Sequence, residues 1–157
     1  MSKNVGKIFE EDFINSVEEG IFHYRFRDLP FHLTRNAKYE VNNNPADFLI
    51  FHNYLFILEL KSCGGTSLPC TNIRDNQVNG LYKYNKMKGV VGGFVINFRK
   101  YNETYFLPIE DYLSIIKSRA SIGIQEARAF GIHVEQKLKR TRYTYDVSKF
   151  LNEFIKR

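Results

Sequence analysis

Two apolar runs separated by a short polar pair occupy residues 44–61, which read NPADFLIFHNYLFILELK. The runs cover residues 48–51 and 55–60, and the polar pair between them is His52 and Asn53. Two short apolar runs joined by turn-forming residues are typical of a β-hairpin. Because both runs are apolar on both faces, we expect both strands to lie inside a sheet that is covered on both sides.

Three charged residues lie at the open end of this predicted hairpin. A turn centred on position 53 places Asp47 opposite Glu59. Residues two apart on a strand share a face, so Lys61 is expected to point the same way as Glu59. Two close carboxylates repel each other unless a cation lies between them. The pattern therefore favours a site for a hard divalent cation, which we expect to be Mg²⁺, with Mn²⁺ as a substitute.

The residues alone also allow two simpler interpretations of Glu59 and Lys61. The strand can emerge into solvent at this point, or the two side chains can simply neutralise each other. Burial of an unpaired charge costs on the order of several kcal/mol, which weighs against an accidental acid and base in an apolar strand.

The hydrophobic periodicity of the rest of the chain predicts the other elements. We expect helices over residues 4–20, 73–86, 109–119 and 147–157, and strands over residues 90–98, 104–107 and 141–145. Residues 21–28 alternate in a way that favours a strand or a continuation of the first helix. Residues 29–46 combine two prolines with a run of asparagines, which is typical of a loop. This order predicts an α/β fold in which a small mixed β-sheet is flanked by helices, within a single domain spanning residues 1–157.

The charge of the chain suits a polyanionic partner. The formal net charge is +6 and the sequence pI is about 9.3, and each cation placed on a phosphate releases a counterion. Aromatic residues are interleaved with the cations, as on a surface that grips phosphates and stacks bases. A solvated basic surface with half-buried tyrosines explains the same pattern. The candidate nucleic-acid contacts are Arg25, Arg27, Arg35, Lys38, Lys83 and Lys86. A further basic segment, residues 137–142, either binds DNA or caps the fold.

Several classes of protein are disfavoured. No run approaches the ~20 apolar residues of a membrane span, and the N-terminal residues lead into acids rather than into an apolar signal segment. We therefore expect a cytoplasmic protein that does not contact membranes. Cys63 and Cys70 are expected to be reduced thiols, because two cysteines without a second pair make a poor zinc site. No glycine-rich phosphate loop is present, so no organic cofactor is expected.

The charged residues of the hairpin belong to a wider pattern. Pro45-Ala-Asp47 followed by Glu59-Leu-Lys61 resembles the PD-(D/E)xK nuclease pattern. An ordered set from about residue 6 to 113 resembles the RecU-type Holliday junction resolvases: Gly6-Lys-Ile-Phe-Glu10-Glu11-Asp-Phe, then Asp47, then Glu59-x-Lys61, then a helix with Gln77, then a strand with Gly92-Gly93. The resemblance implies a restriction-endonuclease-like core and a homodimer that cuts four-way DNA junctions symmetrically with Mg²⁺.

The same resemblance implies a role for individual residues. Asp47 and Glu59 would bind the metal ion, and Lys61 would position the attacking water. Gln77 would lie near them on the second helix. Each of these roles is a hypothesis for the structure to examine.

The first predicted helix offers two acids for the same site. The resemblance implies that Glu10 completes or supports the metal site, but the adjacent Glu11 is an alternative. Both acids also suit the first turn of a helix, where the helix dipole favours negative charge.

One part of the chain departs from the resolvase pattern. Those enzymes carry a protruding stalk before the catalytic aspartate that engages the junction centre, whereas residues 29–44 here are few and lack a clear paired hairpin. Two alternatives to a junction resolvase therefore stay open. One is a nuclease of the same fold that acts on ordinary duplex or single-stranded DNA, and the other is a non-catalytic nucleic-acid-binding module.

Overall fold

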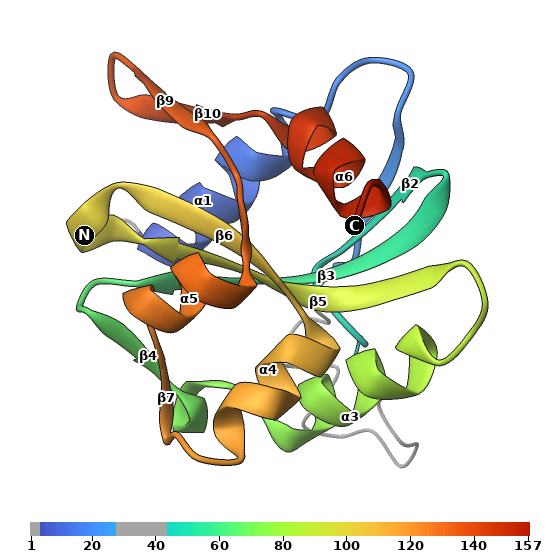
Figure 1. Cartoon of the computed structure of the whole chain (residues 1–157). Coiled ribbons are helices and arrows are strands. Elements are labelled where there is room, and N and C mark those ends of the chain that lie inside the picture. Colours follow the sequence, from blue (N-terminus) through green and yellow to red (C-terminus); the bar gives the residue numbers. More distant parts are fainter. Residues whose placement is uncertain (1–3, 28–43) are drawn as a thin grey trace, which may run out of the picture.

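The computed structural model describes residues 4–27 and 44–157. Within them, the main sheet has six strands in the order β1-β2-β3-β5-β6-β8. Strands β3 and β5 are parallel, and the other neighbouring pairs are antiparallel. The strands are β1 (Phe22–Arg25), β2 (Phe48–His52), β3 (Tyr54–Cys63), β5 (Val90–Phe98), β6 (Glu103–Pro108) and β8 (Ile132–His133). The predicted mixed sheet is confirmed (Figure 1).

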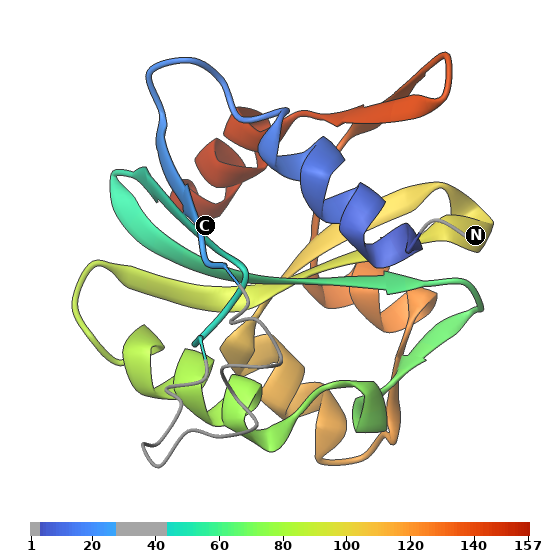
Figure 2. The same ribbon diagram turned by 180° about the vertical axis from the view of Figure 1, so that it is seen from behind.

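Helices cover both faces of the sheet, so the chain forms three layers (Figures 1 and 2). The helices are α1 (Val5–Ile14), α3 (Asp75–Asn85), α4 (Ile109–Ile116), α5 (Ile124–Phe130) and α6 (Val147–Ile155), with two short 3-10 turns, η1 (Cys70–Asn72) and η2 (Arg99–Tyr101). Two small ribbons complete the fold: β4 (Ser67–Pro69) pairs with β7 (Ser121–Gly123), and β9 (Gln136–Lys139) with β10 (Arg142–Tyr145). In the described part of the chain, no helix has both the length and the apolarity needed to cross a membrane.

Each face of the sheet has its own core. Helices α1 and α6 bury Phe13 and Phe150 against one face, whereas α3 and α4 bury Leu81 and Tyr112 against the other. Because side chains alternate along a strand, β3 supplies both cores and is buried over most of its length. A parallel pair needs a long crossover connection, and the segment with α3 supplies it between β3 and β5.

The predicted hairpin is present with the predicted register. Phe48 pairs with Leu58 and His52 pairs with Tyr54, so Asn53 is the turning residue. Its φ is 60°, a left-handed conformation that asparagine tolerates well. The next pair outward from Phe48 and Leu58 would be positions 47 and 59.

The expected burial on both faces is right for β3 but holds for only one face of β2, where Phe48 and Ile50 are fully buried. Phe51 on β2 is 54% exposed, and its partner on the edge strand, Phe22, is 59% exposed. The helix of that face, α3, packs on β5, and in the described part of the chain it does not extend over this end of β1 and β2.

The first helix is shorter than predicted. It ends at Ile14 rather than near Gly20. Ser16 donates a hydrogen bond from its hydroxyl to the carbonyl of Asp12, 2.6 Å away. Asparagine and serine compete with the helix for backbone hydrogen bonds, so Asn15 and Ser16 explain the early end. Gly20 has a φ of 93° in the turn that follows.

A glycine lets α3 lie directly on the sheet. A Cβ added at Gly92 would lie 2.8 Å from the carbonyl oxygen of Leu81. We expect Gly92→Ala to lower the free energy of unfolding by about 1–3 kcal/mol, because overpacking forces the helix backbone to move. Gly65→Ala is the control, since nothing lies within 4 Å of its added Cβ. Equal denaturation midpoints for the two variants would show that α3 does not need a bare backbone at Gly92.

Candidate active site

The site lies where β3 runs on beyond its partner β2. The paired residues start with Phe48 opposite Leu58, but β3 continues to Cys63. The Asp47 side chain takes the place of the missing strand: its Oδ2 accepts a hydrogen bond from the Leu60 N–H at 2.7 Å. The Asp47 N–H donates to the Leu58 carbonyl at 3.1 Å. The carboxylate is thereby fixed against the edge of β3.

Glu59 and Lys61 point together toward α3. The Lys61 Nζ lies 2.9 Å from Glu59 Oε1, and Glu59 is only 3% exposed. The interpretation in which the strand emerges into solvent is therefore wrong for Glu59. The two side chains do form an ion pair, as mutual neutralisation requires, but within residues 4–27 and 44–157 no salt bridge joins Asp47 to a cation.

Gln77 holds both charged groups of β3 from the first turn of α3. Its Nε2 donates to Glu59 Oε1, and its Oε1 accepts from Lys61 Nζ at 3.3 Å. The same Oε1 accepts from the Arg74 N–H at 3.1 Å, which fixes the amide orientation. The structure therefore brings Asp47, Glu59, Lys61 and Gln77 into one place, the candidate site, while their roles stay predictions.

Burial and mutual repulsion disturb the two carboxylates. Burial and then the charge of Glu59 raise the pKa of Asp47 from 3.8 to about 7, against the opposing hydrogen bond from Leu60. Burial also raises the pKa of Glu59, and the main opposing influence is Lys61. Perturbed carboxylates of this kind gather at functional sites. A cation between the two acids would offset both the free-energy cost of burying their charges and the repulsion between them.

Of the two candidate acids on α1, Glu10 is the one near the site. Glu10 lines a hollow of about 700 Å³ together with Asp47, and it forms an ion pair of 2.6 Å with Arg25. Glu11 instead approaches Arg142, at 3.2 Å, on the β9–β10 ribbon. This placement favours Glu10, whose part in metal binding stays a prediction.

The carboxylate pair fits a magnesium ion. Mg²⁺ usually binds through one or two carboxylates and keeps several waters, and Asp47 and Glu59 supply two such groups. Within residues 4–27 and 44–157, no three acidic, histidine or cysteine side chains lie close enough together to hold a metal. Glu10 is therefore not a third ligand in this conformation, in which Arg25 holds it.

The predicted nucleic-acid contacts fall into three groups. Arg25 and Arg27 line the same hollow as Asp47. Lys83 and Lys86 lie on α3 and at its C-terminal end, where the Lys86 ammonium is 4.1 Å from the centre of the Tyr82 ring. Two further candidates, Arg35 and Lys38, lie outside the described residues, as does nearly all of the segment 29–44.

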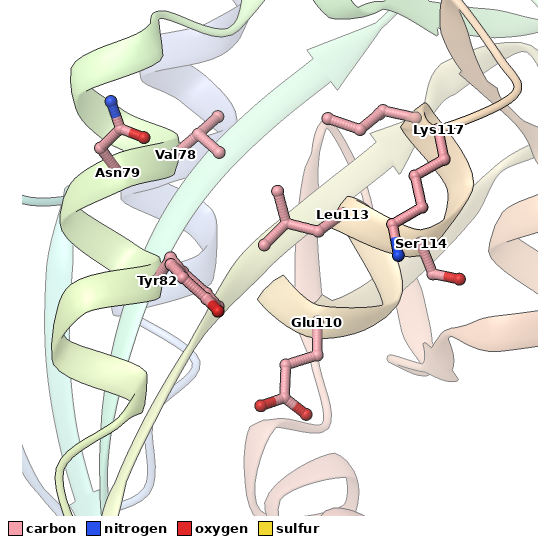
Figure 3. A pocket seen from close by; sticks show the side chains of 8 residues that line it. Val78, Asn79, Tyr82, Glu110, Leu113, Ser114 and Lys117 are labelled. Atoms are coloured by element: carbon pink, nitrogen blue, oxygen red, sulfur yellow. The ribbon is translucent and has the colours of Figure 1, made fainter.

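A second hollow, of about 730 Å³, lies between α3 and α4 (Figure 3). Val78 and Tyr82 on α3 face Leu113 on α4 across it. Glu110 is the one carboxylate among the described residues that line it. This hollow has a single acid among the described residues and does not contain the carboxylate pair of the candidate site.

Sequence reasoning missed Arg74. Its charge lowers the pKa of Glu59, and its N–H holds Gln77 in place. The sequence did contain a signal for Arg74, because it directly precedes the helix that carries Gln77. A cation at that position can reach the end of a neighbouring strand.

Comparisons with known proteins agree with this geometry. Residues 27–149 match the family described as Recombination protein U. That span includes the four residues of the candidate site and leaves out Glu10. An SPbeta prophage-derived uncharacterized protein, YotM of Bacillus subtilis (strain 168), is 31% identical over 176 residues, which cover 99% of this chain and 89% of that protein.

A solved structure has a similar fold. Hjc, a Holliday junction resolvase from the archaeal hyperthermophile Archaeoglobus fulgidus, superposes with a TM-score of 0.50 over 73% of this chain and 83% of its own. The two sequences are 13% identical, so the likeness concerns the fold alone. It confirms the predicted architecture of a mixed sheet with flanking helices.

Proposed function

The chain belongs to the Recombination protein U family, and on that premise we propose that it is a metal-dependent DNA endonuclease that cuts four-way junctions. The observation that carries the proposal is the placement of Asp47 beside Glu59 at the edge of β3, with Lys61 2.9 Å from Glu59. One buried carboxylate, Glu59, beside a half-buried carboxylate, Asp47, and a half-buried ammonium is a costly arrangement unless a cation and a phosphate bind there.

We propose a role in the reaction for each side chain of the site. The Lys61 ammonium has three N–H donors, of which Glu59 and Gln77 use two, and the third would hold the attacking water or an oxygen of the phosphodiester. Asp47 and Glu59 would hold Mg²⁺, with Mn²⁺ as a substitute. When bound, this ion would supply Lewis-acid stabilisation of charge on the phosphate and a lowered pKa for water. Gln77 would keep Glu59 and Lys61 aligned.

The symmetry of the substrate supports a homodimer. Resolution of a four-way junction needs two matched cuts, and each chain offers one carboxylate pair. We therefore propose that two copies act on one junction, in the cytoplasm. The net charge of +6 supports a DNA partner, since a basic surface raises both the affinity and the association rate for a polyanion.

The test compares a labelled synthetic four-way junction with a linear duplex of the same sequence. Each is incubated with the wild-type protein in Mg²⁺, in Mn²⁺ and in EDTA. Paired symmetric nicks in the junction that need the metal are the expected result. A duplex that is cut equally fast would remove the junction specificity and leave a nuclease. Tight binding with no cleavage of any DNA would leave a non-catalytic binding module.

The amide of Gln77 provides a separate prediction. We expect Gln77→Ala to raise the Mg²⁺ concentration needed for half-maximal cleavage by roughly 10- to 100-fold, because loss of a group that orients a metal ligand has effects of that size. The measurement is a Mg²⁺ titration of junction cleavage. Gln125→Ala, on the exposed side of α5, is the control. An unchanged midpoint in Gln77→Ala would show that Glu59 needs no help from α3.

A further inference from the structure

The β9–β10 ribbon projects from the body of the protein (Figures 1 and 2). Its pairing runs from Gln136 opposite Tyr145 to Lys139 opposite Arg142. Arg140 lies in the connecting turn with a φ of 57°. We call this ribbon, residues 136–145, the arm, and the proposed chemistry at Asp47 makes no use of it.

The β10 strand of the arm is fixed to α1 along its length, from Arg142 beside the turn to Tyr145 at the base. The N–H groups of Tyr143 and Tyr145 donate to Asp12 and to Ser16, each at 3.0 Å. Arg142 donates to the buried Asp12 at 2.5 Å. The free edge of β10 is thus closed by side chains of α1, and the arm does not present it for pairing with another strand.

The β9 strand and the turn of the arm carry positive charge into solvent. The pairing register places Lys137, Lys139 and Arg142 on one face of the ribbon. Arg142 is paired with acids of α1. By contrast, no carboxylate within residues 4–27 or 44–157 forms an ion pair with Lys137, Lys139 or Arg140, and all three are exposed. A ribbon with three such cations suits a partner with closely spaced negative charges.

The arm and the candidate site lie on two sides of the same helix. Glu10 of α1 lines the hollow that also contains Asp47, while Asp12 of α1 holds the arm. Both views show α1 between the arm and β3 (Figures 1 and 2). A helix is about 10 Å across, and successive phosphates of one DNA strand are about 3.4 Å apart along the axis. The arm and the hollow that contains Asp47 are therefore separated by about the width of one helix, which a DNA duplex can span within a few base pairs.

We propose that the arm binds the phosphate backbone of duplex DNA a few base pairs from the bond that is cut. The inference rests on the proposed function, because it takes DNA as the ligand of the neighbouring site. Lys137 and Lys139 make the contacts along one face of the ribbon, and Arg140 makes a further contact from the turn. Contacts to phosphate carry no sequence information, so the arm adds affinity and orientation to the complex rather than sequence preference.

The test compares two double variants with the same change in charge. Lys137→Ala/Lys139→Ala alters the arm, while Lys117→Ala/Lys156→Ala removes two exposed lysines at the ends of α4 and α6. Binding of a fluorescent four-way junction is measured in EDTA over a series of KCl concentrations. We expect the arm variant to bind roughly 10- to 100-fold more weakly at about 0.1 M salt and to show a salt slope shallower by about 2.

Each outcome separates the arm from the site. If the arm variant binds as tightly as the control variant, while the wild type binds DNA, the arm proposal is overturned and the proposed function stands. If the wild type binds no DNA, both are overturned. The charge-conserving variant Lys137→Arg/Lys139→Arg is expected to bind like the wild type. Weakening of that variant as severe as that of the alanine pair would show that charge is not the cause and would also overturn the proposal.

Discussion

Asp47→Asn is expected to reduce cleavage of a four-way junction by about a thousandfold or more while leaving junction binding in place. The substitution keeps the shape of the side chain and removes one of two charges that would hold the metal ion, and loss of one member of a catalytic unit has effects of this order. The amide oxygen can still accept the Leu60 N–H. The measurements are single-turnover cleavage in Mg²⁺ and binding of the junction in EDTA.

The control for this variant is Asp111→Asn. Asp111 lies on α4 and pairs with Arg157 at 3.6 Å, so the control makes the same chemical change away from the candidate site. It is expected to cleave like the wild type. Cleavage by Asp47→Asn within tenfold of the control, a difference below about 1.4 kcal/mol in the barrier, would place the chemistry elsewhere.

The same variant has an expected signature in stability. The pKa of Asp47 is raised from 3.8 to about 7 in the folded protein, so folding favours its protonated form. A carboxylate with a raised pKa stabilises the fold fully below its unfolded pKa and loses that contribution as the pH rises through the folded value. In EDTA, we therefore expect Asp47→Asn to be more stable than the wild type above pH ~8, by on the order of 1–4 kcal/mol, with little difference below pH ~4.

Addition of Mg²⁺ should make the wild type more stable than Asp47→Asn, the reverse of the order expected in EDTA. Mg²⁺ that binds the folded wild type stabilises it by mass action, whereas Asp47→Asn has lost one ligand. The measurement is chemical denaturation of both proteins at several pH values, with and without Mg²⁺. A wild type that is the more stable protein in EDTA at high pH would mean that burial and the charge of Glu59 do not raise the pKa of Asp47 in the folded protein.

The centre of the site could be predicted from sequence because it is local. Asp47 and Glu59 are twelve positions apart and symmetric about Asn53, so the turn alone sets their pairing. The period of two along β3 then gives the direction of Lys61. Such short-range relations depend on backbone geometry and require no knowledge of the packing around them.

Other features depend on packing between distant segments, and the sequence could not supply them. Which of Glu10 and Glu11 faces the site depends on the rotation of α1 about its axis, which Arg142 helps to fix from 131 positions away. The exposure of Phe51 depends on where α3 lies over the sheet. The elements between residues 120 and 140, such as the strand Ile132–His133, are too short to show a clear period.

Substitution of Lys61 is expected to have the second large effect on junction cleavage. Lys61→Met keeps the length of the side chain and removes its charge. We expect junction cleavage at saturating Mg²⁺ to fall by roughly 10²- to 10³-fold, the effect of losing a donor aimed at developing charge. Loss of Lys61 also removes the main influence that opposes burial of the Glu59 carboxylate. The pKa of Glu59 should rise further, and metal binding at neutral pH should weaken because the metal must displace a proton.

The control, Lys117→Met, removes an exposed lysine at the end of α4 and is expected to cleave normally. If Lys61 acts only as a structural partner of Glu59, high pH and excess Mg²⁺ should restore full cleavage to Lys61→Met. A defect that persists under both conditions assigns Lys61 to the reaction itself. The double variant Asp47→Asn/Lys61→Met separates the two roles again, because residues that act as one unit lose little more together than the worse single variant does. Fully additive losses would mean that Asp47 and Lys61 serve independent functions, and the proposed common site would then be wrong.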